Sequence, residues 1–185
     1  MSYVLMISEA RLKKITSIDD NVEPDDLVPF ITQAQDLKIQ SVLGTYFYNN
    51  LKDDIANGSV SDDDRTLLND YIAPLLANYA LYLALPSLNF KVKNKAVLNP
   101  TSEESNSTGL DELKYLRQSV RDTAEFYEQR LLDYLCDFAT LFPDYVNPDG
   151  YGMKPEHVKK STGGIYTPKT GARRFPNGYD YPSSL

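Results

Sequence analysis

The stretch LLNDYIAPLLANYALYLAL, residues 67–85, decides the fold because it is the longest apolar run in the chain. Its large apolar residues are Leu67, Leu68, Tyr71, Ile72, Leu75, Leu76, Tyr79, Leu83 and Leu85. A helix that is apolar on more than one face belongs at the centre of a bundle, with neighbours on several sides. Pro74 lacks a backbone N–H, so we expect a bend or a break there.

Capping signals predict more helices before this stretch. Ser61 followed by three aspartates is an N-cap with an acidic first turn, and Pro24-Asp25-Asp26 opens an earlier helix in a similar way. Gly44 is expected to end that earlier helix. Its apolar stripe comprises Leu27, Phe30, Ile31, Ala34 and Leu37, with Val42 as a further candidate. Short helices are expected from Thr45 to Asn57-Gly58 and after Ser8.

A last long helix is predicted from Asp111 to about Leu141 or Phe142, with Pro143 ending it. Its expected stripe comprises Leu113, Leu116, Val120, Ala124, Tyr127, Leu131, Tyr134 or Leu135, and Phe138. About 30 residues at a rise of ~1.5 Å make a rod of roughly 45 Å, longer than a bundle of this size needs. Such length favours a helix that also contacts neighbouring subunits.

The apolar period changes between Pro86 and Pro100, where valines alternate with lysines. This alternation predicts a small β-hairpin over about residues 90–98, in which Phe90–Val92 pairs with Ala96–Leu98. The residues of this hairpin expected to contact a partner are Phe90, Lys91, Lys93 and Lys95. Residues 101–109, TSEESNSTG, are polar and predict a mobile loop.

Residues 144–185 hold six of the nine glycines and five of the eleven prolines, without apolar periodicity. We therefore predict two parts: a helical domain over residues 1–143, able to fold alone, and an extended arm over residues 144–185. Aromatic residues recur through the arm, which favours docking into partner pockets over an idle tail, the alternative interpretation. The expected contact residues of the arm are Tyr151, Tyr166, Arg173, Arg174, Phe175, Tyr179 and Tyr181.

The net charge of −7 is unevenly distributed. From Asp144 onward there are six Lys and Arg against four Asp and Glu, whereas the preceding body has 13 against 22. An acidic body repels phosphate, so specific binding of nucleic acid is not expected. A basic arm after an acidic body suggests instead that the arm of one copy lies on a neighbour.

The sequence offers no recognisable catalytic, cofactor or metal site, and we predict that the protein is not an enzyme. The single histidine, His157, lies in the glycine- and proline-rich arm, and no Glu-x-x-His pair for a di-iron centre is present. The single cysteine, Cys136, is expected to be a buried, inert thiol of the last helix. The first residues, MSYVLMISEARLKK, predict neither a signal peptide nor a membrane span.

The expected fold is therefore mainly α: a bundle of about four to five helices with a small β-hairpin and an extended C-terminal arm. Three segments carry a resemblance beyond this pattern: PFITQAQDLKIQSVLGTYFYNNL (29–51), LLNDYIAPLLANYALYLALPSLNFKVKNKAVL (67–98) and LDELKYLRQSVRDTAEFYEQRLLDYL (110–135). In order and pattern they resemble the head–tail connector, or adaptor, proteins of tailed bacteriophages, and most of all those of crAss-like gut phages and Bacteroides prophages. The resemblance covers roughly Ser2 to Tyr145.

The resemblance implies a virion protein, made in the host cytoplasm, that forms a homo-oligomeric ring, usually of twelve copies, at the head–tail junction. Its implied partners are other copies, the portal protein and the next tail or ring protein, and DNA passes through the lumen without specific binding. The hairpin and the loop after it would contact the portal or the tail, and the arm would reach a neighbouring subunit. Two alternatives stay open: an assembly factor or scaffold-like binding module absent from the finished particle, and an enzyme with an unfamiliar carboxylate site.

Overall fold

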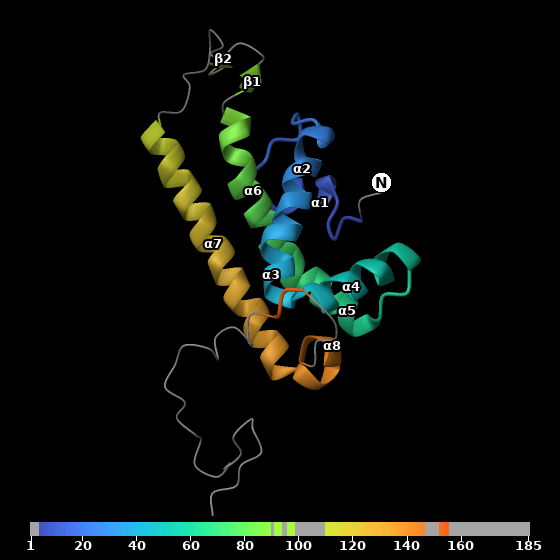
Figure 1. Cartoon of the computed structure of the whole chain (residues 1–185). Helices are drawn as coiled ribbons and strands as arrows, with labels where there is room; N and C mark the ends of the chain where they lie inside the picture. The colour runs from blue at the N-terminus through green and yellow to red at the C-terminus, as the bar shows by residue number, and fades with distance from the viewer. Residues whose placement is uncertain (1–3, 90, 94–95, 99–109, 147–151, 156–185) are drawn as a thin grey trace, which may run out of the picture.

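A computed structural model describes residues 4–89, 91–93, 96–98, 110–146 and 152–155, and helices dominate it (Figure 1). The prediction of a mainly helical protein is confirmed. The helices are α1 (Glu9–Ile15), α2 (Pro24–Ala34), η1 (Gln35–Ile39), α3 (Gln40–Leu43), α4 (Thr45–Asn57), α5 (Asp62–Thr66), η2 (Leu67–Ile72), α6 (Ala73–Asn89), α7 (Leu110–Asp137), η3 (Ala139–Leu141) and α8 (Pro143–Val146). Here η1 and η2 are π-helical turns, and η3 is a 3₁₀ turn.

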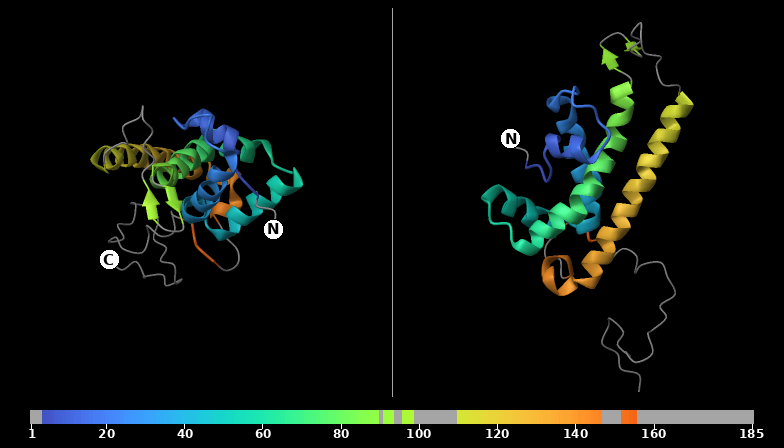
Figure 2. Two further views of the ribbon diagram at one scale, coloured as in Figure 1. Left: turned by 90° about the horizontal axis from the view of Figure 1, so that it is seen from above. Right: turned by 180° about the vertical axis from the view of Figure 1, so that it is seen from behind.

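Helix α6 occupies the centre of the bundle. It lies between α2 on one side and α7 on the other, as the views from the front and from above both show (Figures 1 and 2). Leu75, Leu76, Ala77 and Ala80 are fully buried along it. The central position expected for the apolar stretch is therefore observed, and it explains why more than one face of this helix is apolar.

By length and composition alone, the same stretch is long and apolar enough to cross a membrane. Residues Asp62–Leu88 form a continuous helical segment whose most apolar window has a mean hydropathy of 1.3. A core helix with neighbours on several sides has the same composition, and the position of α6 between α2 and α7 accounts for it.

Pro74 was expected to bend or break this helix, and the structure resolves the problem with a wider turn. The π-helical turn η2 ends two residues before Pro74, and the N–H of Ala73 donates to the carbonyl of Leu68, five residues back. A proline ring clashes with the carbonyl four residues before it, and a π turn moves that carbonyl aside. The Asn78 amide also donates to the Pro74 carbonyl at 2.8 Å. The chain therefore stays helical from Asp62 to Asn89.

A second π turn changes which residues of the α2–α3 segment are buried. Leu37 was expected in the apolar stripe, but its side chain is 52% exposed. Gln35 is buried instead: its Oε1 accepts from the Met6 N–H at 2.7 Å, and its Nε2 donates to the Val4 carbonyl at 3.1 Å. The turn η1 adds a residue to the helical repeat, which rotates the following side chains around the axis.

The last helix ends earlier than predicted. Helix α7 stops at Asp137, a 3₁₀ turn follows, and Pro143 begins α8 rather than ending a helix. Proline is well suited to a first helical position because its missing N–H would have no partner there. Helix α8 packs against α4: the rings of Phe142 and Tyr145 lie 5.9 and 6.4 Å from the ring of Phe47, and both are buried.

Two strands follow α6: β1 (Lys91–Lys93) and β2 (Ala96–Leu98). They pair antiparallel with Val92 opposite Val97. They lie at the far end of the α6–α7 pair from α8 (Figure 1). The predicted hairpin residue Phe90 and the residues between the strands lie outside the described part of the chain, as do residues 101–109.

Core leucines identified from the sequence provide a stability test. Leu76 of α6 and Leu131 of α7 are both fully buried. Replacing either with alanine should lower the free energy of unfolding by about 2–5 kcal/mol, because it leaves a cavity. The matched control is Leu116→Ala on α7, where the side chain is 43% exposed and the expected change is within about 0.5 kcal/mol. Urea unfolding of the three variants checks this, and equal losses would contradict the burial described for α6 and α7.

Candidate interaction surfaces

The structure describes few of the residues predicted to contact partners. Lys91 and Lys93 lie in strand β1, opposite Leu98 and Ala96 respectively. Phe90, Lys95 and the seven predicted arm residues lie outside the described part of the chain; the arm residues are Tyr151, Tyr166, Arg173, Arg174, Phe175, Tyr179 and Tyr181. The contact roles of the hairpin and of the arm therefore stay predictions.

Side chains that could carry chemistry are dispersed over the described residues. No group of three or more His, Cys, Asp or Glu side chains there lies close enough to hold a metal ion. Cys136 was expected to be buried, and that prediction is wrong: the thiol is exposed. Leu135 takes the core position instead, because α7 turns the side chain after it toward the outside.

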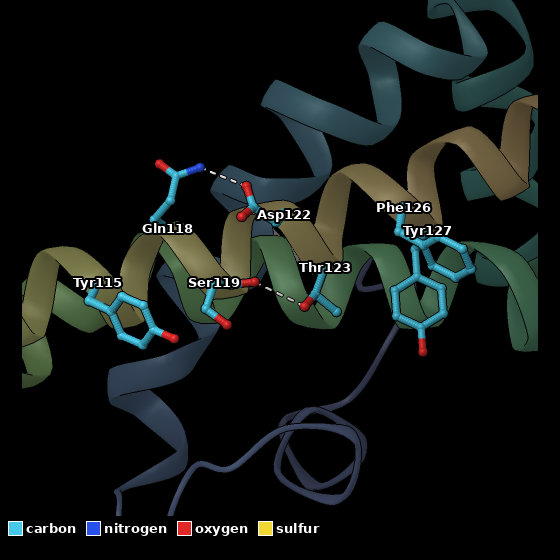
Figure 3. A pocket seen from close by; sticks show the side chains of 7 residues that line it. All are labelled: Tyr115, Gln118, Ser119, Asp122, Thr123, Phe126 and Tyr127. Atoms are coloured by element: carbon cyan, nitrogen blue, oxygen red, sulfur yellow. Dashed lines mark hydrogen bonds between the residues drawn. The ribbon is translucent and has the colours of Figure 1, made fainter.

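The described part of α7 has a shallow trough on its surface, with a volume of about 490 Å³. Tyr115 lies at one end, Phe126 and Tyr127 lie at the other, and the hydroxyl side chains of Ser119 and Thr123 lie between them (Figure 3). Tyr115 is 79% exposed and Phe126 is 65% exposed. Large aromatic rings this exposed are typical of surfaces that bind another protein.

The residues that line the trough also include one carboxylate. Asp122 is exposed, and its Oδ1 accepts from the Gln118 amide at 2.6 Å (Figure 3). Arg121 directly precedes Asp122 on the helix, but its Nε donates to Glu125 at 2.8 Å. This hydrogen bond to Glu125 raises the pKa of the Arg121 guanidinium. The trough therefore combines exposed rings with a carboxylate that accepts a hydrogen bond from a neutral amide.

Other cations of this region lie against aromatic rings of the core helices. The guanidinium of Arg117 lies 4.4 Å from the ring centre of Tyr82, and that of Arg130 lies 4.9 Å from the ring centre of Tyr71. Such cation–π contacts hold a positive charge close to the protein. The Tyr71 ring also stacks on Tyr134 at 3.9 Å, and burial raises the pKa of the Tyr134 phenol.

Sequence reasoning missed the trough because it followed the apolar stripe. Tyr115 and Phe126 stand among charged residues on the polar side of α7, where aromatic residues have no place in a core. Their position on the polar side of the helix was the sequence signal that could have identified the trough. A tyrosine or phenylalanine on the polar face of a long helix indicates a contact surface more directly than the helix length did.

A second feature joins a segment after α8 to the start of α4. Residues 152–155, which we call the strap, lie against the corner between α3 and α4. The Thr45 N–H donates to the Met153 carbonyl at 2.8 Å, and the Met153 N–H donates to the Thr45 hydroxyl at 2.9 Å. The first N–H groups of a helix have no partner within the helix, and Gly44 has no side chain to cap α4. The strap supplies that missing acceptor.

Two glycines make this close approach possible. Gly44 has φ +78° and ψ 158°, and a Cβ there would lie 2.7 Å from Cδ of the buried Pro155. Gly152 has φ +124°, and a Cβ there would lie 2.6 Å from the Thr45 hydroxyl. The folded body thus continues beyond Pro143, the predicted end of the helical domain, through α8 and the strap.

A family described as a family of unknown function (DUF6712) matches residues 39–154, more than half of the chain. The chain belongs to this family. The match includes α7 and α8 and reaches into the strap. No curated protein and no solved structure matches the chain.

Replacing Gly44 with alanine should distinguish the effect of the strap contact on stability from the cost of a positive φ alone. Gly44→Ala combines a backbone conformation reserved for glycine with a clash against Pro155, so we expect a loss of at least about 2 kcal/mol in the free energy of unfolding. The control is Gly58→Ala. Gly58 has φ +69° with open space around it, so that variant should lose only about 1 kcal/mol. Urea unfolding measures both, and equal losses would mean that the strap does not constrain Gly44.

Two truncations should locate the end of the folded body. A chain ending at Pro155 keeps α8 and the strap, so its thermal midpoint should match that of the full chain. A chain ending at Pro143 loses buried Tyr145 and the acceptor for Thr45, which should cost on the order of 3–5 kcal/mol. Thermal and urea unfolding compare the two. Equal stability of both truncations would restore the boundary at residue 143 predicted from the sequence.

Proposed function

We propose that this protein is a structural component of a tailed-phage particle, a connector that forms a ring between portal and tail and extends the DNA channel. The sequence resemblance supports the proposal over roughly residues 2–145. The observation that carries it furthest is the outer face of α7. This helix packs against α6 and leaves exposed the rings of Tyr115 and Phe126.

A ring needs a contact between two different patches of adjacent subunits. A long helix with one face on its own core and exposed aromatic residues on another can supply one such patch. Aromatic side chains are enriched at protein interfaces because they bury a large area with few rotatable bonds. In the proposed assembly, the outer face of α7 contacts the neighbouring subunit.

The two ends of the α6–α7 pair suit contacts along the axis of such a ring. The strands β1 and β2 lie at one end, and α8 with the strap lies at the other (Figures 1 and 2). In this proposal the hairpin, with Lys91 and Lys93, contacts the portal or the next tail protein. The arm after the strap crosses to a neighbouring subunit, where many weak contacts repeated around the ring add up.

The charge of the body suits a channel for DNA. Residues 1–155 contain 24 Asp and Glu against 14 Lys and Arg. Several of the described cations already have partners within the protein: Lys38 pairs with Glu128 at 2.6 Å, and Arg117 and Arg130 lie over tyrosine rings. A lumen with excess negative charge repels the DNA backbone, so DNA slides through it without being held. The proposal therefore includes no enzymatic activity, cofactor or membrane.

Electron microscopy of the full chain mixed with the portal protein of the same genome tests the proposal. The expected result is a new ring of density stacked on the portal, which also gives the symmetry; each protein alone is the control. Absence of any association, together with absence of the protein from purified virions, would overturn the proposal. That outcome would favour the alternative of an assembly factor or scaffold-like binding module.

A further inference from the structure

The trough on α7 has the chemistry to bind an arginine-rich, aromatic peptide. The Asp122 carboxylate lies on the same helix as two exposed rings, seven residues after Tyr115 and four before Phe126. Its amide donor, Gln118, carries no charge. An arginine side chain can pair with a carboxylate and stack its planar guanidinium on a neighbouring aromatic ring. A lysine would supply only the charge.

The chain carries a segment of this kind beyond the strap. Residues 156–185 contain five Lys and Arg against two Asp and Glu, opposite in sign to the body. The only adjacent pair of arginines in the sequence, Arg173-Arg174, lies in this segment and is followed directly by Phe175. The strap fixes Pro155 at the α3–α4 corner, so 17 residues lie between this anchor and Arg173. Fully extended, they span at most roughly 60 Å, which is enough to reach an adjacent molecule.

We propose that the α7 trough of one copy binds the Arg173-Arg174-Phe175 segment of a neighbouring copy. An arginine pairs with Asp122 and stacks on Tyr115 or Phe126, and the Phe175 ring adds apolar contact with the exposed rings. This inference rests on the proposed ring and deepens it, because it names the two patches that meet. The trough and the segment are different surfaces of the same chain, so their contact is head-to-tail and can repeat from copy to copy until a ring closes.

Photo-crosslinking between two forms of the full chain tests this contact. One form is unlabelled and carries benzoylphenylalanine at position 175; the other is labelled with ¹⁵N and lacks the crosslinker. The forms are mixed with the second in excess, illuminated and digested, and the crosslinked peptides are identified by mass spectrometry. The expected product joins position 175 to a labelled peptide from the stretch Tyr115–Tyr127. Because the partner peptide is labelled, the product can arise only between copies.

Charge reversal tests the role of Asp122. Asp122→Arg in the labelled form should lower the crosslink yield about tenfold or more, because like charges then meet. Replacing both arginines of the crosslinker form, Arg173→Asp with Arg174→Asp, should restore most of the yield. The matched control is Asp133→Arg on the same helix, since Asp133 also accepts from a glutamine four residues earlier at 2.6 Å but lies outside the trough. This control should keep the yield within about twofold, because the side chain is exposed and lies outside the proposed contact.

The outcomes of these experiments distinguish a failure of the trough contact from a failure of the proposed connector function. Crosslinks mainly within the unlabelled copy, crosslinks to other elements, or equal effects of the reversals at Asp122 and Asp133 would overturn it. Thermal unfolding of every variant ensures that a lost crosslink does not reflect a lost fold. If the protein stacks on the portal but the trough is not crosslinked, the connector function stands and this contact fails. If the trough is crosslinked between copies but no density appears on the portal, the contact stands and the connector function fails.

Discussion

The burial of α6 is the constraint on which the rest of the structure depends. A helix with apolar residues around most of its circumference cannot meet water on any broad face, so other helices must cover it. Helix α2 covers one side and α7 covers the other. Because α6 is covered in this way, the far side of α7 is free to carry aromatic and charged residues. The position of the trough is thus a consequence of what α6 requires.

The central helix and much of the core could be predicted from the sequence because they depend on local periodicity. Leu76 and Leu131 were identified in this way and are fully buried. Periodicity assumes a constant number of residues per turn, and the π turns break that assumption. At η1, Leu37 is exposed and Gln35 is buried, and the Gln35 amide satisfies two backbone groups near the start of the chain. Pro74 is the sequence signal for η2, and η1 has no such signal.

The end of the body and the trough could not be predicted, for two different reasons. The strap depends on contacts between residues more than a hundred positions apart, and its composition of glycine and proline is the same as that of a flexible tail. The trough depends on which side of α7 faces α6, and the helical period alone did not settle this. Cys136 illustrates the point: its aromatic and leucine neighbours suggested burial, yet a rotation by one residue places Leu135 in the core and the thiol outside.

The strap also sets the order in which the protein can be completed during its synthesis. Thr45 and Met153 are 108 positions apart, so the corner between α3 and α4 lacks its partner until the strap has left the ribosome. Until then the first turn of α4 lacks its acceptor, and Phe47 lacks the rings of Phe142 and Tyr145. Domains of a nascent chain fold as their residues emerge, and contacts between distant residues form last. A nascent chain of this protein therefore exposes the apolar face around Phe47 until α8 and the strap have emerged, and their docking covers it.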